Sequence, residues 1–453
     1  MIFPLPLSPF EESLWRDDRP AFPWDIVVRL RFAGRLEQEA LRAAVAAALA
    51  RHPLLRANIG RDAAGQPAWV PARQPGPEIA WSALAGDGRL PSIPRIDACR
   101  DFPLRFWAAE GGGRSELVAH LYHACVDGLG AIQFLGDLLL AYAAAVCGPA
   151  AAPPLPPVDE KLLPRRGTYG LTALRLVRLS PKLAIGLLGA RKFIMRKALP
   201  LLPHAPIPVD APLPEGYPAT LVHTFSVAET AAMLAAARRQ QVTLNDHLAC
   251  GCFTALDGWR RSRGLTDDDR WLRLMVPVSL RGADDREMPA ANLMSAVFLD
   301  RRPADVADPA RLLRGIHEEM ALIKRNNLGL IFVLGLSVCR RLPGGIERVV
   351  RRQPSLATAI LTNLNRPLES LPLPREDAKI VAGNVVLEGC ELFPAVRPGT
   401  CAAVGLLSYA GRLCLCLHYD ARVLDLDQAT DLLARFVAAA GSEGDEGTGG
   451  LGI

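Results

Sequence analysis

Apolar and polar positions along the chain follow the strand period and the helix period in turn, which predicts alternating strands and helices. In the first third, strands are predicted over Asp25 to Phe32, in a run ending at Ile59, and over Pro67 to Val70, Leu104 to Ala109 and Ser115 to Tyr122. Helices are predicted over Glu37 to Ala50 and Gly128 to about Cys147. This order predicts an α/β protein in which helices pack on mixed sheets.

A second block of the same kind begins near Thr220. Its predicted strands are Thr220 to Phe225, Trp271 to Leu280, Leu293 to Leu299, Ala357 to Leu361, Val381 to Leu387, Ala402 to Tyr409 and Arg412 to Tyr419. Its predicted helices are Ala228 to Gln240, Thr243 to about Arg263, Pro309 to Asn326 and Asp425 to Ala440. Two such blocks in 453 residues, 50% of them hydrophobic, predict two domains with a core each.

Proline-rich stretches separate the two blocks. Pro149 to Pro164 and Ala198 to Pro218 hold too many prolines for helices or inner strands. We expect four parts, namely an N-terminal lobe (1–165), a basic apolar insertion with linker (166–218), a C-terminal lobe (219–440) and a disordered tail (441–453).

The insertion has an unusual composition. Thr172 to Lys197 interleaves leucines with lysines and arginines, and Ser180 with Pro181 would cap and begin a helix within it. Its uninterrupted apolar run, Leu183 to Ala190, is far shorter than the roughly 20 residues that span a bilayer. Two interpretations stay open: an interfacial helix attracted to anionic lipid headgroups, giving peripheral membrane contact, and a segment buried between the lobes.

The overall composition excludes some classes of protein. A net charge of +5 is mildly basic, but the arginines are dispersed and few aromatics accompany them, so we expect no nucleic-acid partner. The ten cysteines lack a short repeating spacing, and several sit in apolar runs, as reduced buried thiols do. The first residues, MIFPLPLSPFEESLW, lack the features of a secretory signal, so we expect a cytoplasmic protein.

One short motif carries candidate chemistry. The run His120 to Gly128, HLYHACVDG, places an imidazole, a carboxylate and a glycine at the spacing His-x-x-x-Asp-Gly between a predicted strand and a predicted helix. An imidazole titrates near neutrality, so His123 would serve as a general base if its ring is held in place. A structural histidine is the alternative. A metal site of His120, His123, Cys125 and Asp127 is a weaker interpretation, because no second Cys or His pair follows at ligand spacing, and we expect no metal.

Further segments accompany this motif in a fixed order. They are PLSPFEESLW and RHPLLRANI before it, then TLNDHLACGCFTAL at Thr243 to Leu256 and VPVSLR at Val276 to Arg281. Together they resemble the chloramphenicol-acetyltransferase-like superfamily, which includes condensation domains of nonribosomal peptide synthesis, plant alcohol acyltransferases and bacterial wax ester synthases. The resemblance spans nearly the whole chain. It implies two similar lobes around a central tunnel with the motif histidine in its middle.

The resemblance also implies an activity, that of an acyl-coenzyme A-dependent O-acyltransferase of lipid metabolism. His123 would take the proton of an acceptor hydroxyl, or less readily an amine, as it attacks the thioester of coenzyme A or of an acyl carrier protein. Coenzyme A would be a co-substrate, and no permanently bound cofactor is expected. A non-catalytic protein that binds a carrier or a lipid is one alternative, and thioester hydrolysis is another.

The family pattern assigns supporting roles. Its motif aspartate pairs with an arginine at a Pro-Val-x-x-Arg strand end, which implies that Arg281 pairs with Asp127. Gly128 would permit close backbone approach at a helix start whose N–H groups favour negative charge. Tyr122 stands where condensation domains carry a first histidine. A DFGWG-like motif is absent, and ILTNLNR at Ile360 to Arg366 takes its place.

Three residues are candidate substrate-binding positions: Asn292, Asn363 and Tyr122. Asn292 lies in AANLMSAV, which resembles a Gly-Asn site of the family, and an ordinary asparagine at a strand entry is the alternative. Asn363 would contact the thioester or the oxyanion, or else stabilise a turn. Asn245 and Asp246 open a predicted helix, and helix capping explains them as well as a catalytic role does.

Overall fold

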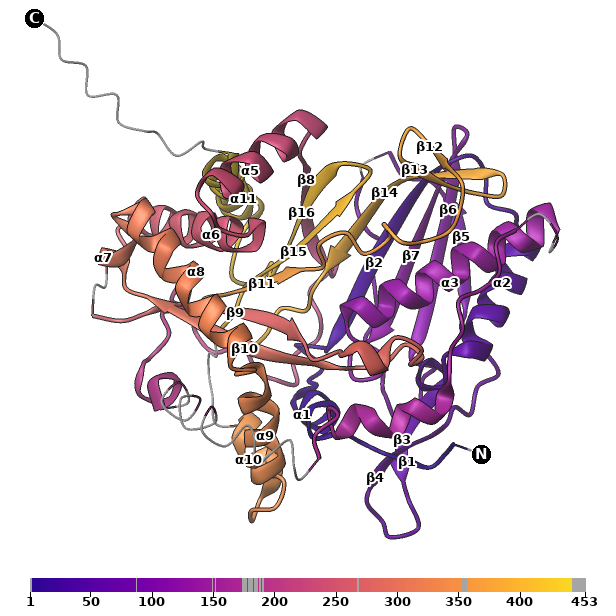
Figure 1. Cartoon of the computed structure of the whole chain (residues 1–453), viewed down its shortest axis with the longest axis horizontal. Helices are drawn as coiled ribbons and strands as arrows, with labels where there is room; N and C mark the ends of the chain where they lie inside the picture. Colours follow the sequence, from indigo (N-terminus) through magenta and orange to yellow (C-terminus); the bar gives the residue numbers. More distant parts are fainter. Residues whose placement is uncertain are drawn as a thin grey trace, which may run out of the picture.

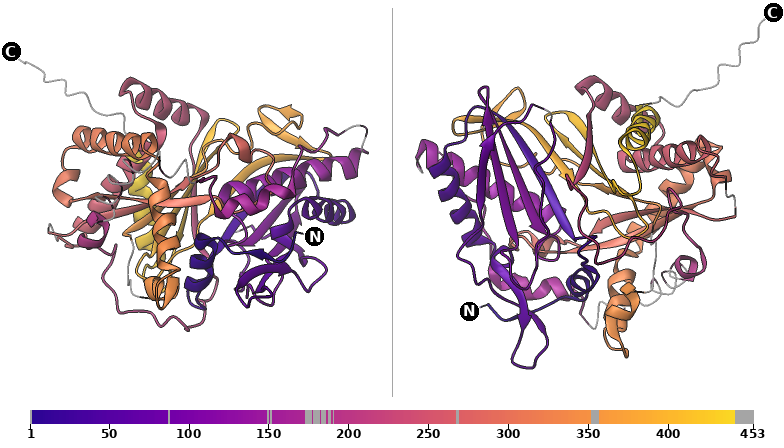
Figure 2. Two further views of the ribbon diagram at one scale, coloured as in Figure 1. Left: turned by 60° about the horizontal axis from the view of Figure 1, so that its bottom comes forward. Right: turned by 180° about the vertical axis from the view of Figure 1, so that it is seen from behind.

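The computed structural model describes residues 2–86, 88–148, 150, 152–172, 177, 182, 186, 189, 191–266, 269–351 and 357–441. Two large sheets stand side by side in these residues, and helices pack against each of them (Figures 1 and 2). One lobe comes mainly from the first third of the chain and the other mainly from the second half. This is the two-lobed, mixed α/β architecture that the sequence predicted.

The N-terminal lobe is built on a seven-stranded sheet with the order β12-β13-β14-β2-β7-β6-β5. Its strands are β2 (Asp25–Ala33), β5 (Ile79–Ala83), β6 (Leu104–Gly111), β7 (Arg114–Tyr122), β12 (Arg375–Glu376), β13 (Lys379–Ala382) and β14 (Val385–Phe393). Helices α2 (Gln38–Arg51) and α3 (Gly128–Cys147) pack together on one face of this sheet (Figure 1).

A smaller unit lies below this sheet in Figure 1. Its three strands, in sheet order, are β1 (Leu5–Pro6), β4 (Pro67–Pro71) and β3 (Ala57–Arg61). The Trp69 side chain of β4 donates a hydrogen bond to Glu11 of helix α1 (Pro9–Asp17). Two short 3-10 helices, η1 (Pro53–Arg56) and η2 (Glu160–Gly167), complete the lobe.

The C-terminal lobe is built on a six-stranded sheet with the order β10-β9-β11-β15-β16-β8. Its strands are β8 (Ala219–Thr224), β9 (Leu272–Ser279), β10 (Met294–Arg301), β11 (Ala359–Asn363), β15 (Ala402–Tyr409) and β16 (Arg412–Tyr419). Its helices are α5 (Val227–Arg239), α6 (Leu244–Arg261), α7 (Pro303–Val306), α8 (Pro309–Arg325), α9 (Gly329–Cys339), α10 (Gly345–Arg351) and α11 (Leu426–Gly441).

The two lobes exchange segments of chain. Strand β14 pairs with β2, so β12 to β14 extend the N-terminal sheet although they lie late in the sequence. Between β9 and β10, the chain leaves the C-terminal lobe and buries Met288, Ala290, Ala291 and Leu293 in the N-terminal core. We call residues 290–293 the strap. Because the strap reaches the start of α3, residues of both lobes meet at the His-x-x-x-Asp-Gly motif.

Most predicted elements are present near their expected bounds, and α3 spans the predicted range from Gly128 to Cys147. The strand predicted to end at Ile59 begins later, because Pro53 initiates η1. The single strand predicted over Val381 to Leu387 is the hairpin of β13 and β14, which turns at Gly383 with a φ of +61°. Predicted features outside the described residues are Ser180, Pro181 and the tail beyond residue 441.

Helix α1 was not predicted from hydrophobic periodicity. Its start is encoded instead by a capping box, in which the side chains of Ser8 and Glu11 each accept a hydrogen bond from the other's backbone N–H. Pro9 occupies the first turn, where its missing N–H costs nothing. A nine-residue helix is too short for a reliable apolar period, so the capping box is the feature of the sequence that indicates this helix.

Helix α3 is the one described helix that is long and apolar enough to cross a membrane by length and composition, and 72% of its tested window is buried. Helices α8 and α9 pass the same test as a pair bent by 60°. Core helices of folded proteins meet this test too, and Phe134, Leu135 and Leu138 of α3 lie in the N-terminal core. Core packing therefore explains the apolar surface of α3.

His418 in β16 provides a test of the core through pH. Its Nδ1 atom lies 2.7 Å from the Pro394 carbonyl oxygen, and burial lowers its pKa from 6.5 to about 4. Between these two pH values the unfolded chain binds a proton that the folded chain excludes, so stability should fall as the pH falls. We expect wild type to lose about 3 kcal/mol more than His418→Asn across this window. Urea titrations at several pH values measure the difference, and equal pH slopes would contradict the prediction.

Candidate active site

His123 sits in the turn between β7 and α3, where a strand and a helix place it at the junction of the lobes. Its backbone N–H donates to the Trp24 carbonyl oxygen at 2.9 Å, and the Trp24 ring packs edge-on against the imidazole at 5.6 Å. The Trp24 ring is itself held by the Arg397 guanidinium, 4.1 Å from its centre. The imidazole is therefore fixed by neighbours but remains half-buried rather than sealed.

The hydrogen bonds of His123 determine which ring nitrogen can accept a proton. Nδ1 lies 3.1 Å from the Val126 carbonyl oxygen, which can only accept, so Nδ1 carries the hydrogen in the neutral ring. Nε2 then bears the lone pair, and it has no hydrogen-bond partner among the described residues, in a residue that is partly exposed. Burial lowers the pKa of His123 below 6.5, against opposing contributions that include Asp127. A neutral imidazole with an open Nε2 is the form that a general base requires.

Asp127 and Arg281 form the ion pair that the resemblance implied. Arg281 Nη1 lies 2.6 Å from Asp127 Oδ2, and Nη2 lies 2.9 Å from Oδ1. The same carboxylate accepts the N–H groups of Gly130 at 2.8 Å and Leu293 at 2.9 Å. With four hydrogen bonds and 2% residual exposure, Asp127 has no capacity left for a substrate. Its role in this arrangement is to join the motif to the C-terminal lobe.

The strap holds the other side of the motif. The Ala291 carbonyl oxygen accepts Arg281 Nη2 at 2.9 Å, and Asn292 Nδ2 donates to the His123 carbonyl oxygen at 2.9 Å. Asn292 is 1% exposed, and this bond gives it a positioning role toward the His123 backbone. Its expected contact with substrate stays a prediction. The sequence could not reveal the bond to His123, because it joins residues 169 positions apart.

The other candidate residues have different surroundings. Tyr122 is fully buried, and its hydroxyl has no hydrogen-bond partner in the described part of the chain. Its expected substrate-binding role stays a prediction. As the last residue of β7 it pairs with Asp25, and its side chain lies in the core. Asn363 is partly exposed at the end of β11, and its Oδ1 accepts the N–H of Asn365. That bond is the turn role, and it leaves the Asn363 amide group available.

Glycines at the start of α3 allow the lobes to approach each other closely. A Cβ atom at Gly128 would lie 3.0 Å from a Leu364 methyl group, and one at Gly130 would lie 2.8 Å from the Ala291 carbonyl oxygen. Gly128 therefore has the expected close-approach role. Gly130, whose N–H is already taken by Asp127, was not singled out from the sequence although its position is tighter.

His52 is a second residue that the sequence did not single out. It is fully buried at the end of α2, and its Nδ1 accepts the Ala290 N–H at 2.9 Å. Because Nδ1 accepts, Nε2 carries the hydrogen and faces Asp137 Oδ2 at 3.2 Å. His52 thus anchors the strap to the N-terminal lobe at Ala290. The next two strap residues, Ala291 and Asn292, bond Arg281 and His123.

Replacing His52 by leucine should lower kcat as well as stability. The change leaves the buried Ala290 N–H without its acceptor, at a cost of about 1–3 kcal/mol, and loosens the strap that orients His123. Since Asn292 acts through the same strap, the loss caused by Asn292→Ala should be smaller in the His52→Leu background than in wild type. Thiol-release kinetics of the two single variants and the double variant measure this coupling.

A matched control for His52 is available in the C-terminal lobe. His247 is also buried and bonds a single backbone carbonyl oxygen, that of Ala440, at 2.9 Å. His247→Leu should lower the urea midpoint with little change in kcat. If the losses of kcat caused by His52→Leu and Asn292→Ala were strictly additive in free energy, His52 would not act through the strap.

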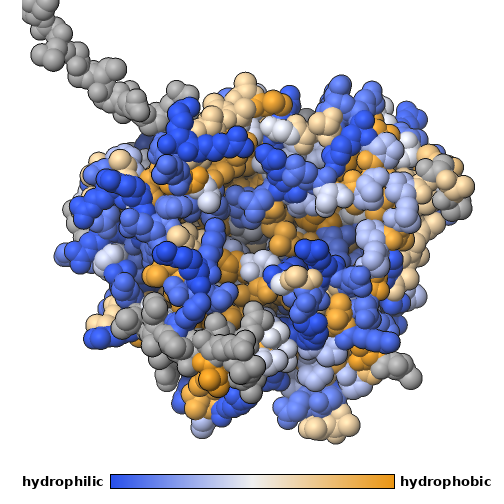
Figure 3. All heavy atoms as spheres, viewed as in Figure 1, coloured by the Kyte–Doolittle hydropathy of each residue, from blue (hydrophilic) through white to orange (hydrophobic). Residues whose placement is uncertain are grey.

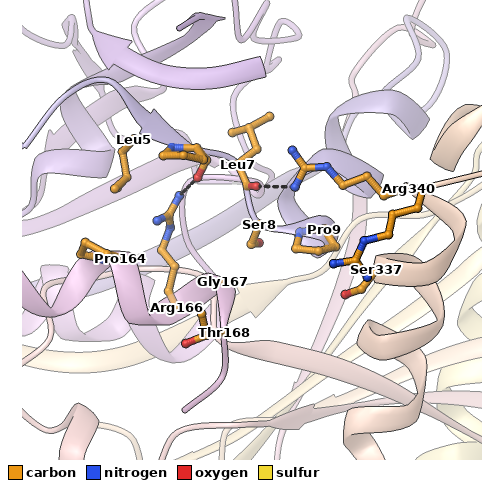
Figure 4. Close-up of a pocket in the computed structure, with 12 residues that line it drawn as sticks. Leu5, Leu7, Ser8, Pro9, Pro164, Arg166, Gly167, Thr168, Ser337 and Arg340 are labelled. Carbon is orange, nitrogen blue, oxygen red and sulfur yellow. Dashed lines mark hydrogen bonds between the residues drawn. The ribbon is translucent and has the colours of Figure 1, made fainter. Parts of the chain in front are cut away.

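Two further features of the described residues bear on the site. No group of three or more His, Cys, Asp or Glu side chains among them is arranged to hold a metal ion. A pocket of about 610 Å³ lies away from His123, where α1, η2 and α9 meet (Figure 4). In it Arg166 donates to the Pro6 carbonyl oxygen and Arg340 to that of Leu7. Figure 3 shows hydrophobic side chains in the hollow between the lobes.

Comparisons with known sequences cover only part of the chain. No family model matches it. It is 31% identical over 149 residues to a probable non-canonical nonribosomal peptide synthetase, CymA, of Salinispora arenicola, which is 31% of this chain and 2% of that protein. It is 33% identical over 159 residues to isonitrile lipopeptide synthase of Mycobacterium tuberculosis, which is 32% of this chain and 6% of that protein. The chain thus spans a small fraction of the length of both relatives.

Comparisons with solved structures cover the whole fold. The first condensation domain of the CDA synthetase has a TM-score of 0.70 and 16% identity, covering 97% of this chain and 95% of its own. Polyketide synthase associated protein 5 from Mycobacterium tuberculosis has a TM-score of 0.63 and 18% identity over 98% and 99%. The starter condensation domain of rhizomide synthetase RzmA, in complex with C8-CoA, has a TM-score of 0.66 and 12% identity over 96% and 94%. The chain therefore has the condensation-domain fold.

Proposed function

We propose that this protein is an acyltransferase that moves an acyl group from a thioester to a hydroxyl acceptor, with His123 as the general base. The observation that carries the proposal is the accessible Nε2 atom of His123, whose partner nitrogen is fixed on Val126. The condensation-domain fold supports it, and one protein of that fold was crystallised with an acyl-coenzyme A. The donor in the proposal is accordingly coenzyme A or a carrier-protein thioester.

The reaction balances with this chain's groups alone. The acceptor oxygen attacks the thioester carbonyl carbon while its proton passes to His123 Nε2, which gives a tetrahedral intermediate and an imidazolium. The C–S bond then breaks, and the departing thiolate takes the proton back from Nε2. The acyl group ends on the acceptor oxygen, and the histidine returns to its neutral form. Asp127 carries negative charge near the ring and favours the transient imidazolium.

The choice of a hydroxyl over an amine acceptor rests on the sequence around Thr362 to Leu364, which resembles the wax ester synthase and alcohol acetyltransferase branches of the superfamily. An alcohol, unlike an alkyl ammonium, also carries no charge that must be removed before attack.

The test is thiol release from a series of acyl-coenzyme A donors with a panel of alcohols and amines. Mass spectrometry of the products identifies the acyl chain and the acceptor together. Acceptor-dependent ester formation would support the proposal. Release of free acid without an acceptor would indicate hydrolysis, amide products would overturn the hydroxyl assignment, and binding without turnover would indicate a non-catalytic binding protein.

A further inference from the structure

Exposed hydrophobic side chains gather at one end of the molecule. The five most exposed large ones among the described residues are Val177, Ile194, Met195, Val338 and Leu342, with exposed fractions between 57% and 77%. They come from two segments, the basic apolar insertion and the end of α9 with the turn after it. Helix α9 lies at the lower tip of the molecule in Figure 1, where Figure 3 shows hydrophobic atoms at the surface.

The two segments pack against each other. Gly186 of the insertion is buried against the Ile331 side chain of α9, and Lys182 Nζ donates to the Arg325 carbonyl oxygen at the end of α8. Further along, the Phe193 ring contacts that of Phe298 in β10 at 4.5 Å, and Phe298 contacts the Phe332 ring of α9 at 6.0 Å. The exposed residues therefore lie on two segments that are in contact with each other.

This region also carries positive charge. Arg191, Lys192 and Lys197 are exposed in the insertion, and Arg341 is exposed directly before Leu342. No Asp or Glu occurs between Glu160 and Asp210, and none between Glu319 and Glu347. We call the five exposed hydrophobic residues and these four basic residues the basal surface. The basal surface thus combines exposed hydrophobic side chains with basic side chains, and a lipid surface with anionic headgroups matches both properties.

We propose that the basal surface docks the protein on anionic lipid membranes as a peripheral contact. Hydrophobic side chains enter the boundary between headgroups and acyl chains, and the basic side chains neutralise the headgroups. The pocket drawn in Figure 4 opens beside this surface, because the chain that exposes Val338 and Leu342 also contributes Ser337, Arg340 and Arg341 to it. A headgroup phosphate could therefore reach Arg341 at the pocket rim. The proposal is independent of catalysis.

Vesicle flotation tests this docking. Wild type should float with vesicles of phosphatidylcholine mixed with an equal amount of phosphatidylglycerol, and poorly with phosphatidylcholine alone, and high salt should release it. Ile194→Ser with Leu342→Ser should lower the partition coefficient about tenfold or more, because two side chains no longer enter the apolar layer. Arg191→Glu with Lys192→Glu should lower it by a similar factor and remove most of the salt dependence.

The control is Val227→Ser with Leu426→Ser, which removes two comparably exposed side chains on α5 and α11 and should leave binding unchanged. His123→Ala should also bind as wild type does, so a failed catalytic proposal would not affect this result. Wild type that stays unbound to anionic vesicles would overturn the docking proposal. Equal binding by the basal and control variants would overturn it too. So would the finding that the basal variants act by abolishing self-association of the protein.

Discussion

Replacing His123 by alanine should lower kcat for thiol release about 100- to 10,000-fold, which corresponds to about 3–5 kcal/mol of activation free energy. The reason is that Asp127, the carboxylate of the same motif, is fully engaged by four hydrogen bonds and cannot replace the imidazole as the base. The KM for the acyl donor should change little, because the imidazole accepts the proton in the transition state and does not bind the donor. Steady-state kinetics with a saturating acceptor measure both parameters.

Controls separate this loss from misfolding. His204 is partly exposed, and its one hydrogen bond among the described residues is to the adjacent Ala205 carbonyl oxygen, so His204→Ala should keep full activity. Added imidazole should restore part of the activity of His123→Ala, because the removed ring leaves a space of its own shape. Unchanged turnover in His123→Ala would remove this residue from the mechanism.

The pH dependence of kcat/KM also tests His123 as the general base. Because burial lowers the pKa of His123, the neutral base should persist below pH 6.5, and kcat/KM should fall only at more acidic values. An acid limb near the ordinary histidine value or above it would mean that the base is more exposed or more stabilised as a cation than the structure shows. The profile in deuterated and normal water would further report whether proton transfer limits the rate.

Replacing Arg281 by methionine should destabilise the protein by about 3–5 kcal/mol, because the buried Asp127 carboxylate loses its bidentate partner. The strap also loses its bond to the Ala291 carbonyl oxygen, so activity should fall with stability. Urea unfolding gives the free energy, and thiol release gives the activity. Arg281→Lys should recover only part of either, since one ammonium group cannot reproduce a planar fork that serves three acceptors.

A double variant distinguishes the ion pair from the side chains alone. Adding Asp127→Asn to Arg281→Met removes the unpaired charge, although the single amide oxygen can accept only one of the N–H groups of Gly130 and Leu293, which bond different carboxylate oxygens in wild type. The double variant should therefore be more stable than Arg281→Met by a measurable amount. If Arg281→Met were as stable as wild type, burial of the Asp127 carboxylate would not require its ion pair with Arg281.

The motif and Arg281 could be recognised from the sequence because each lies in a short local pattern. His123, Asp127 and Gly128 fall within six residues at a strand-to-helix turn, and Arg281 ends a strand with a characteristic sequence. Hydrophobic periodicity located α3 and most strands, because long elements repeat their period often enough to be recognised. Short elements such as α1 and β12 repeat it too few times.

The supporting residues were not readable for a different reason. His52, Trp24 and Asn292 look like ordinary core or loop residues in the sequence, and each acts through one contact with a residue far along the chain. Asn292 was expected to meet substrate, and only the structure shows that it also holds the His123 backbone. A pattern read within a window of a dozen residues contains no information about such pairs.

The sequence by itself determined the two α/β blocks and the candidate base, since these depend on local periods and on a motif whose members are close together, and the family resemblance implied the ion pair. Only the tertiary structure decided that β12 to β14 join the N-terminal sheet, that the strap crosses between lobes, and that Nε2 of His123 remains open. These facts depend on which distant segments bury one another's apolar surface and satisfy one another's backbone groups, and that choice is made by the whole fold.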